Sequence, residues 1–243
     1  MSQPPFRRLG RAAYVACGAS VSAVALIVLW LATVFARSPR RAIALQRVAS
    51  RFMLACLGCR FAAHGAELPP AGAARVFVAN HTSYLDIPLL LAALKHDFVF
   101  VTKRELLDWP FFSRIARAGG HIPVDRDSVE SRGAAVARIV KTLRAGRSVL
   151  IFPEGTFSYD DGLRPFQVGA FKSAVATGVP IVPVALKGVA RLWSQHAPFP
   201  RPGQVEIWIG EALYLAPGNN EEAQLECLRE AALRFITAHL SRS

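Results

Sequence analysis

The stretch that decides the fold reads ARVFVANHTSYLDIPLLLAAL and occupies residues 74–94. Its first part, 75–79, is short, apolar and partly β-branched, which predicts a buried strand. Its last part, 87–94, is apolar throughout and predicts a buried helix. His81 therefore follows a strand, and Asp86 stands five positions later at the start of a helix. In open α/β sheets, ligands bind in the crevice beyond the carboxyl ends of the strands, so both residues are candidates for chemistry.

His81 and Asp86 allow two interpretations. A neutral imidazole can take a proton from a hydroxyl group, while a nearby carboxylate fixes its tautomer and stabilises the imidazolium that forms. The pattern Ser83-x-x-Asp86 also matches a helix capping box, in which Asp86 would only satisfy backbone amides. His81 would then be an ordinary strand-end histidine. This stretch alone leaves both interpretations open.

The composition favours a membrane-associated protein. The 243 residues suffice for one α/β domain with an attachment, and 52% of them are hydrophobic while only 19% are charged. The net charge of +12 favours polyanionic partners, either nucleic acid or an anionic lipid surface. Because the arginines are spread along the chain and no nucleic-acid-binding motif is present, we do not expect nucleic acid as a partner.

Several familiar kinds of site are missing from the sequence. Four cysteines do not make a disulfide framework in a chain of this length, and Cys56-x-x-Cys59 lacks a second pair of metal ligands. These cysteines are expected to pack as small hydrophobic residues. No P-loop, GxGxxG or GxSxG pattern occurs, so phosphate-binding glycine loops, dinucleotide binding and a serine hydrolase elbow lose their usual support.

The N-terminal residues, 1–63, are expected to form a membrane anchor. Residues 12–36 carry no charge, and a helix of this length would be roughly 37 Å long, enough to cross a hydrocarbon core of about 30 Å. The run is long for a signal peptide and arginines follow it at once, so we expect a retained anchor. Arginines flank both of its ends, which leaves open whether it crosses the membrane or dips into one leaflet.

A second, amphipathic helix is expected at 42–61, interrupted by Arg47 and Arg51. It would complete a helical hairpin by lying in the membrane interface, or it would simply pack on the globular domain. The loop 65–72 then separates the anchor from a domain expected at 64–243.

Strands and helices alternate through that domain, which predicts an α/β sandwich with a mostly parallel central sheet flanked by helices. The prolines in 179–186 suggest that this strand lies at a sheet edge or forms a kinked pocket wall. Strands are expected at 75–79, 98–102, 121–124, 148–152, 181–186 and 204–209, and helices at 84–94, 110–117, 129–145, 167–177 and 221–240.

Two further clusters combine a strand with a polar turn. In the first, Gly119 and Gly120 lead into a strand that ends near Arg126, whose guanidinium suits bidentate phosphate binding or an ion pair with a neighbouring aspartate. In the second, an apolar strand leads to Glu154 and Gly155. The glycine would allow a ligand to approach the backbone, and its amide could serve a developing oxyanion, unless the segment is only a solvated turn.

In order and spacing, four blocks of this chain resemble the glycerolipid acyltransferase family, whose best-known members are the 1-acyl-glycerol-3-phosphate (lysophosphatidate) acyltransferases. The resemblance covers about residues 75 to 190. Its blocks are the His-x4-Asp segment 80–86, the glycine–arginine segment 120–126, the Glu-Gly-Thr segment 152–158 and the Val-Pro segment 179–184.

The resemblance implies an enzyme with a catalytic His81–Asp86 pair. His81 would be the general base on the acceptor hydroxyl, which then attacks an acyl thioester, and Asp86 would orient it. No metal or cofactor is implied, because the thioester of acyl-CoA or acyl-carrier protein is already activated. Arg126 would bind the acceptor phosphate. The remaining implied substrate-binding residues are Glu154, Gly155 and Thr156 at the acceptor site and Lys103 at the acyl tunnel.

One residue departs from the family pattern. Lysophosphatidate acyltransferases usually carry Arg directly after Glu-Gly-Thr, where it helps to hold phosphate, and this chain carries Phe157. Arg164 or Lys172 would compensate, or the acceptor would be another lyso-lipid such as lyso-ornithine lipid. The alternative outside enzymes is a non-catalytic membrane lipid-binding protein. The enzyme is expected at the inner (cytoplasmic) membrane, with its active site on the cytoplasmic side, where acyl thioesters are made.

Overall fold

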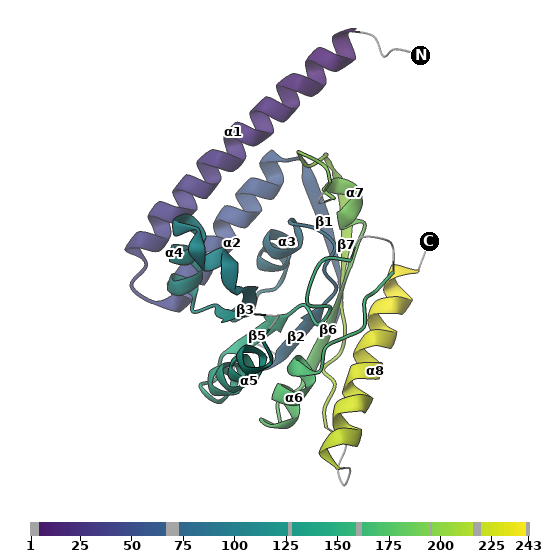
Figure 1. The fold of residues 1–243 in the computed structure, drawn as a ribbon. Helices are drawn as coiled ribbons and strands as arrows, with labels where there is room; N and C mark the ends of the chain where they lie inside the picture. Colours follow the sequence, from purple (N-terminus) through teal and green to yellow (C-terminus); the bar gives the residue numbers. More distant parts are fainter. Residues whose placement is uncertain are drawn as a thin grey trace.

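The computed structural model describes residues 5–66, 73–125, 128–158, 162–194, 196–215 and 220–241, with the backbone alone for 5–15, 26, 34 and 129. A seven-stranded sheet forms the centre, and helices cover both of its faces (Figure 1). In chain order the elements are α1 (Pro5–Phe35), α2 (Pro39–Cys56), β1 (Cys59–Gly65), β2 (Val76–Ala79), α3 (Asp86–Ala93), β3 (Phe98–Lys103), the 3-10 helix η1 (Arg104–Asp108), α4 (Pro110–Gly119), β4 (Ile122–Val124), α5 (Val129–Arg144), β5 (Ser148–Ile151), α6 (Gly169–Val175), β6 (Ile181–Lys187), α7 (Val189–Leu192), β7 (Gly203–Ile209) and α8 (Glu221–Leu240).

The sheet is mostly parallel, as the alternation of strands and helices predicts. Its strand order is β1-β7-β6-β2-β5-β3-β4, and only the β6–β7 pair is antiparallel. β2 lies between β5 and β6 and runs parallel to both. The carboxyl ends of β2 and β5 therefore meet at the same edge of the sheet, which is where ligands bind in folds of this class.

The core consists of one hydrophobic layer on each face of the sheet. Successive side chains of a strand point to opposite faces, so Phe77 joins the layer beneath α2 and α3 while Val76 and Val78 join the layer beneath α5, α6 and α8. All three are fully buried. Since both faces are covered, the central strands read as continuous apolar runs, which explains why they are visible in the sequence.

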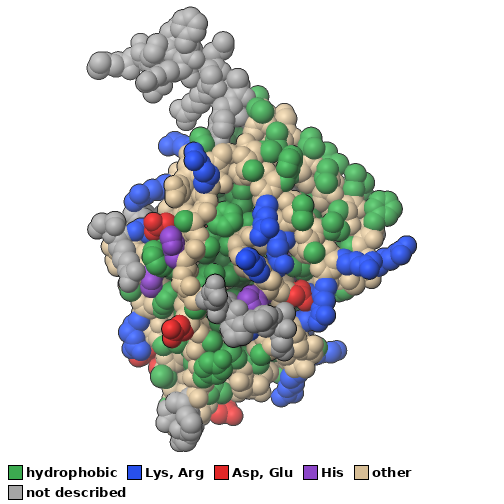
Figure 2. Space-filling view, turned by 180° about the vertical axis from the view of Figure 1, so that it is seen from behind, with side chains coloured by type: hydrophobic (Ala, Val, Ile, Leu, Met, Phe, Trp, Pro, Cys, Tyr) green, Lys and Arg blue, Asp and Glu red, His purple; other side chains and the backbone are tan. Residues whose placement is uncertain are grey.

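α1 is a long apolar helix that presents much of its surface to the outside. Among the described residues, one stretch is long and apolar enough to cross a membrane, Ala16–Thr33, with a mean hydropathy of 2.0. Hydrophobic side chains gather on the side of the molecule where α1 lies, with Lys and Arg side chains at the margin (Figure 2). The exposed members of α1 are Val24, Ile27, Val28, Trp30, Leu31 and Phe35.

α2 packs on the domain, which is one of the two outcomes expected for it. Ile43 and Leu54 enter the core beneath it, while Val48 and Phe52 remain exposed on its outer face. Its end differs from the expected one: the helix stops at Cys56, and residues 59–65 form β1, which pairs with β7. The positive φ of Gly58, 64°, allows the turn between them. The expected domain boundary between residues 63 and 64 therefore falls inside a strand.

The arginines that interrupt α2 bond backbone carbonyls of the neighbouring helix, although Arg51 remains exposed. Arg47 donates from Nε to the carbonyl of Leu91 (3.1 Å), and Arg51 donates from Nε and Nη2 to the carbonyl of Ala92 (3.1 and 3.0 Å). These carbonyls belong to the last turn of α3, which has no further helical partners for them. Cations there also interact favourably with the helix dipole. The two arginines thus fasten α2 to the end of α3.

The prolines in 179–186 do not mark a sheet edge, so that alternative was wrong: Pro180 precedes β6, and Pro183 is the one proline within the strand. β6 is internal, between β7 and β2. The Pro183 carbonyl accepts from the Gly210 amide (2.8 Å), so the Pro183 nitrogen also faces the β7 side. The β6–β7 ladder begins only at Val184, and the missing N–H of Pro183 therefore costs the sheet no ladder bond.

Candidate active site

Two loops meet beyond the carboxyl ends of β2 and β5. The loop after β2 carries His81, and the loop after β5 carries Glu154 and Phe157. Asn80, fully buried, fixes the start of the first loop: its Nδ2 donates to the Leu186 carbonyl (3.0 Å), and its Oδ1 accepts from the Leu186 amide (2.7 Å). The side chain thus continues the β2–β6 pairing one residue past the strand. These two bonds fix the backbone to the sheet directly before His81.

The backbone of His81 is held on both sides by the second loop. Its amide donates to Glu154 Oε1 (2.8 Å), and its carbonyl accepts from the Ser158 amide (2.8 Å). Both bonds join segments more than seventy residues apart in the sequence, so folding of the sheet is needed before the histidine is placed.

His81 and Asp86 form a buried hydrogen-bonded pair. The Nδ1 of His81 lies 2.8 Å from Asp86 Oδ2, and the two residues are 8% and 0% exposed. An ionised carboxylate only accepts, so Nδ1 carries the proton and Nε2 keeps the lone pair. No described residue hydrogen-bonds Nε2. This is the arrangement that a general base requires.

Asp86, the first residue of α3, also binds the loop that precedes this helix. Its Oδ2 accepts from the amides of Thr82 (2.7 Å) and Ser83 (2.8 Å), just before α3 begins. One oxygen of Asp86 thus bonds both the histidine and the two loop amides, a geometry compatible with either interpretation, and the catalytic role stays a prediction. Within the described residues, the second oxygen, Oδ1, is buried without a hydrogen-bond partner.

Aromatic rings enclose the two faces of the His81 imidazole. Phe152 stacks on one side at a centroid distance of 3.9 Å, and Phe157 contacts the ring at 4.1 Å with a tilt of 35°. Tyr84 lies against Phe157 (5.0 Å) and against Trp193 (5.4 Å). With Nδ1 bonded and both faces covered, the Nε2 edge is the part of the ring that remains for a substrate.

Glu154 holds the second loop together. It is 5% exposed, and its Oε2 accepts from the Ser158 hydroxyl and from the Arg164 amide (3.0 Å), while Oε1 accepts from His81. Both carboxylate oxygens are thus used within the protein. This geometry favours a positioning role for Glu154, which the sequence did not indicate.

The neighbours of Glu154 differ in what they offer. Gly155 has a φ of 75°, which favours glycine at this turn. Its amide donates to the Phe152 carbonyl (3.1 Å), a turn bond that it would have to exchange for an oxyanion, so that role stays a prediction. Thr156 is partly exposed next to it.

The expected cationic ligands are exposed at the surface or lie outside the described residues. Lys103 ends β3 at the surface, where it pairs with Glu105 at 2.9 Å, and it lines neither of the two described cavities. Arg126 lies outside the described residues. Arg164 is exposed and approaches the site through its backbone amide, and Lys172 is exposed on α6. Within the described ranges, no three His, Cys, Asp or Glu side chains gather as metal ligands would.

Two titratable groups near the core, the partly buried His121 and the buried Cys59, have structural roles. His121 accepts from the Phe100 amide at Nδ1 (3.1 Å), and burial together with the nearby Arg147 lowers its pKa to about 4. Burial raises the pKa of the Cys59 thiol to about 11, so this cysteine stays protonated and packs as a small hydrophobic residue.

The sequence indicated the pair but not its surroundings. The aromatic enclosure by Phe152 and Phe157 and the clamp by Asn80 were missed, because apolar residues beside a strand end are indistinguishable from core residues until the loops are placed. The available signal was closeness in the sequence: Asn80 is next to His81, Phe152 is two positions before Glu154, and Phe157 and Ser158 are three and four positions after it.

Comparison with known proteins agrees with this geometry. Residues 60–187 match the family model described as Acyltransferase. The chain is 35% identical over 175 residues to a 1-acyl-sn-glycerol-3-phosphate acyltransferase of Chlamydomonas reinhardtii, covering 72% of this chain and 52% of that protein. It is 37% identical over 126 residues to a chloroplastic enzyme of the same name from Brassica napus, covering 52% and 36%. The chain thus spans about half the length, or less, of these curated relatives.

The fold has a close counterpart among solved structures. The crystal structure of the 1-acyl-sn-glycerophosphate acyltransferase from Thermotoga maritima superposes with a TM-score of 0.79 at 22% sequence identity, covering 98% of this chain and 99% of the other. At this identity the likeness concerns the fold, including the helices that precede the sheet. The family match covers just over half of the chain and contains His81, Asp86 and Glu154. The protein therefore belongs to the acyltransferase family.

Proposed function

We propose that the protein transfers a fatty acyl group from an acyl thioester to the free hydroxyl of a lysophospholipid, with 1-acyl-glycerol-3-phosphate as the first candidate acceptor. The observation that carries this proposal is the His81–Asp86 pair, which leaves one basic nitrogen at the carboxyl edge of a parallel sheet. The names of the relatives from Chlamydomonas and Brassica support the acceptor.

The reaction would need only proton transfer and positioning. His81 Nε2 takes the proton of the acceptor hydroxyl as its oxygen attacks the thioester carbonyl, the carbon–sulfur bond breaks, and the proton passes to the leaving thiolate. Asp86 stabilises the imidazolium through the bond to Nδ1. A thioester needs no metal or covalent enzyme intermediate, so the donor would be acyl-CoA or acyl-carrier protein, and no cofactor is proposed.

Substrate contacts are proposed for residues near the pair. Thr156 and Gly155 would line the acceptor site beside His81, and Arg126 would bind the acceptor phosphate. Glu154 would shape this site through the loops that it joins. Lys103 remains a proposed contact of the acyl chain or donor from the surface end of β3.

The membrane is the proposed location of the protein. α1 exposes an apolar face, and the acceptor and product are lipids, so we propose that α1 and the outer face of α2 lie in the inner membrane with the site on its cytoplasmic side. Protease access to the N-terminus in sealed vesicles distinguishes a crossing helix from one that dips into a single leaflet.

A second candidate acceptor follows from Phe157. A phenyl ring contacts His81 where an arginine was expected to hold phosphate, and the described cationic candidates Lys103, Arg164 and Lys172 are exposed at the surface. Another lyso-lipid, such as lyso-ornithine lipid, therefore remains the alternative acceptor.

The test is release of thiol from acyl-CoA by the purified protein in detergent, with lysophosphatidate, lyso-ornithine lipid and lysophosphatidylglycerol offered separately. Acceptor-dependent release should fall on the order of 10²-fold or more in the His81→Ala variant, because general base catalysis contributes that much. If no acceptor supports release with either acyl-CoA or acyl-carrier protein, a lipid-binding role replaces the enzymatic one.

A further inference from the structure

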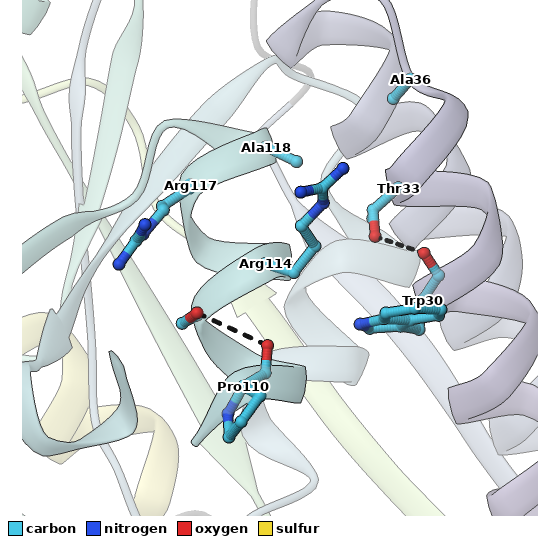
Figure 3. A pocket seen from close by; sticks show the side chains of 8 residues that line it. Trp30, Thr33, Ala36, Pro110, Arg114, Arg117 and Ala118 are labelled. Atoms are coloured by element: carbon cyan, nitrogen blue, oxygen red, sulfur yellow. Dashed lines mark hydrogen bonds between the residues drawn. The ribbon is translucent and has the colours of Figure 1, made fainter. Parts of the chain in front are cut away.

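A cavity of about 560 Å³ opens between the end of α1 and α4, on a part of the molecule that shares no lining residue with the His81 site. Figure 3 shows Trp30 extending from α1 into this space and Arg114 extending from α4 toward α1. Arg117 extends from α4 in another direction, away from α1. The cavity is lined by Trp30, Thr33, Ala36, Pro110, Ser113, Arg114, Arg117 and Ala118.

One continuous face of α4 lines the cavity. Positions 110, 113, 114, 117 and 118 are spaced three and four residues apart, so they fall on the same side of the helix. Two packed helices normally fill the space between them with apolar side chains. Here the lining face of α4 carries Arg114, which extends toward α1, and Arg117, which extends away from it, and the helices leave a hollow.

The hollow is cationic and offers mainly hydrogen-bond donors. None of its described lining residues is acidic, and no described residue pairs or hydrogen-bonds with the guanidinium groups of Arg114 and Arg117 or with the indole N–H of Trp30. The hydroxyl protons of Thr33 and Ser113 are already donated to backbone carbonyls within their own helices (2.7 and 3.4 Å). A guanidinium and an indole N–H that face one space suit an anion with several acceptor oxygens, such as a phosphate group.

The surface beside the hollow is apolar. Ile27 lies one helical turn before Trp30 and is 56% exposed, and Leu31 follows Trp30 and is 46% exposed. Both continue into the exposed apolar face of α1. A ligand that fills the hollow with an anionic group and covers this face with hydrocarbon would satisfy both surfaces, and tryptophan is the side chain that typically lies where headgroup and hydrocarbon meet.

We propose that the α1–α4 cavity is a binding site for an anionic phospholipid of the surrounding bilayer, distinct from the acceptor site at His81. The lipid phosphate lies against Arg114, with the indole N–H of Trp30 as a second donor, and the acyl chains follow the exposed face of α1. The lipid would hold α1 against α4. This inference goes beyond acyl transfer and does not depend on it.

The test measures equilibrium binding to the full chain in a neutral detergent, in the His81→Ala background so that no turnover occurs. The probes are dioctanoyl phosphatidylglycerol, dioctanoyl phosphatidylcholine and inorganic phosphate. The variants are Arg114→Ala, Arg114→Lys, Trp30→Phe and the control Arg144→Ala, which removes one exposed arginine from α5 on another part of the molecule. Unfolding temperatures without lipid show that each variant folds.

We expect phosphatidylglycerol to bind, and Arg114→Ala to weaken it about ten-fold or more, since a charge-assisted contact to phosphate is lost. Arg114→Lys and Trp30→Phe should weaken it less, and Arg144→Ala should change it less than two-fold. Equal binding to the Arg114→Ala variant, or equal binding of phosphatidylcholine, overturns the site. If inorganic phosphate binds as tightly as the lipid, the cavity is an anion site and the lipid assignment is wrong. Thiol release is measured separately, so failure of the proposed enzyme leaves this result intact.

Discussion

Replacement of Asp86 by asparagine separates the charge of this residue from its geometry. In Asp86→Asn, the side-chain oxygen can keep the position of Oδ2, where it still accepts from His81 Nδ1 and from the amides of Thr82 and Ser83. The new amide nitrogen then takes the position of Oδ1, a buried atom without a partner among the described residues. The histidine should therefore keep its place while its partner loses the negative charge.

The size of both effects follows from this geometry. Opposite charges about 4 Å apart interact with about 4 kcal/mol at an effective dielectric constant of about 20, which corresponds to a loss of about 10³-fold in kcat/KM when the imidazolium loses its counter-charge. A buried amide nitrogen without an acceptor costs about 1–3 kcal/mol of the free energy of unfolding. The variant should thus fold, somewhat less stably, and be nearly inactive.

The assay is acceptor-dependent thiol release, with unfolding measured on the same preparations. Asp86→Ala serves as the comparison, because it deprives all three N–H donors of their acceptor and should lose more stability than Asp86→Asn. If Asp86→Asn keeps kcat/KM within ten-fold of the wild type while His81→Ala is inactive, the carboxylate charge does not support the base, and our account of the pair is wrong.

Three other substitutions test the remaining parts of the site and core. Glu154→Gln should lower kcat and cost about 2 kcal/mol of the free energy of unfolding, because the new amide N–H would face a group that now donates to the carboxylate. The KM for the acceptor should change little. A raised KM at unchanged stability would show that Glu154 contacts the substrate. Phe157→Arg should raise the preference for lysophosphatidate over lyso-ornithine lipid by about ten-fold, as expected for one charge-assisted contact with phosphate, and an unchanged ratio contradicts the role given to this residue. The pKa of His121 lies at about 4, below its ordinary value of 6.5, so the unfolded chain binds the proton more tightly. The contribution of neutral His121 to the free energy of unfolding is therefore fully present above pH 6.5. Up to about 3 kcal/mol of it is lost as the pH drops to 4. His121→Asn should remove this dependence, which denaturant titrations across that range would reveal; an identical slope in both proteins contradicts it.

The elements that the sequence predicted well are those buried on both sides. β2, β5 and β6 are continuous apolar runs, and the structure places each within one residue of its expected bounds. β1 escaped prediction because it is an edge strand with a largely exposed, partly polar sequence, and its pairing with β7 depends on a partner more than a hundred residues away. α7 and the 3-10 helix η1 also escaped prediction, since such short elements carry no periodic pattern.

How much of the candidate site could be predicted also depended on whether its contacts are local in the sequence. His81 and Asp86 could be found from spacing, because only four residues separate them in the sequence. The bonds from Glu154 to His81 and from Asn80 to Leu186 could not, because they join strands whose neighbours only the folded sheet determines. Polar residues that serve another loop look the same in a sequence as residues that serve a substrate.

The fastening of α2 to α3 bears on how this protein can be handled. Because Arg47 and Arg51 bond the last carbonyls of α3, the helix that begins at Asp86, the N-terminal segment is a structural part of the domain that carries His81 and not a detachable tether. A fragment made by cutting after α2 would leave the carbonyls of Leu91 and Ala92 without their arginine donors. It would also expose the hydrophobic layer that α2 covers. Solubility is better sought by replacing Val48 and Phe52, whose side chains point outward, with polar residues while the helix itself is kept.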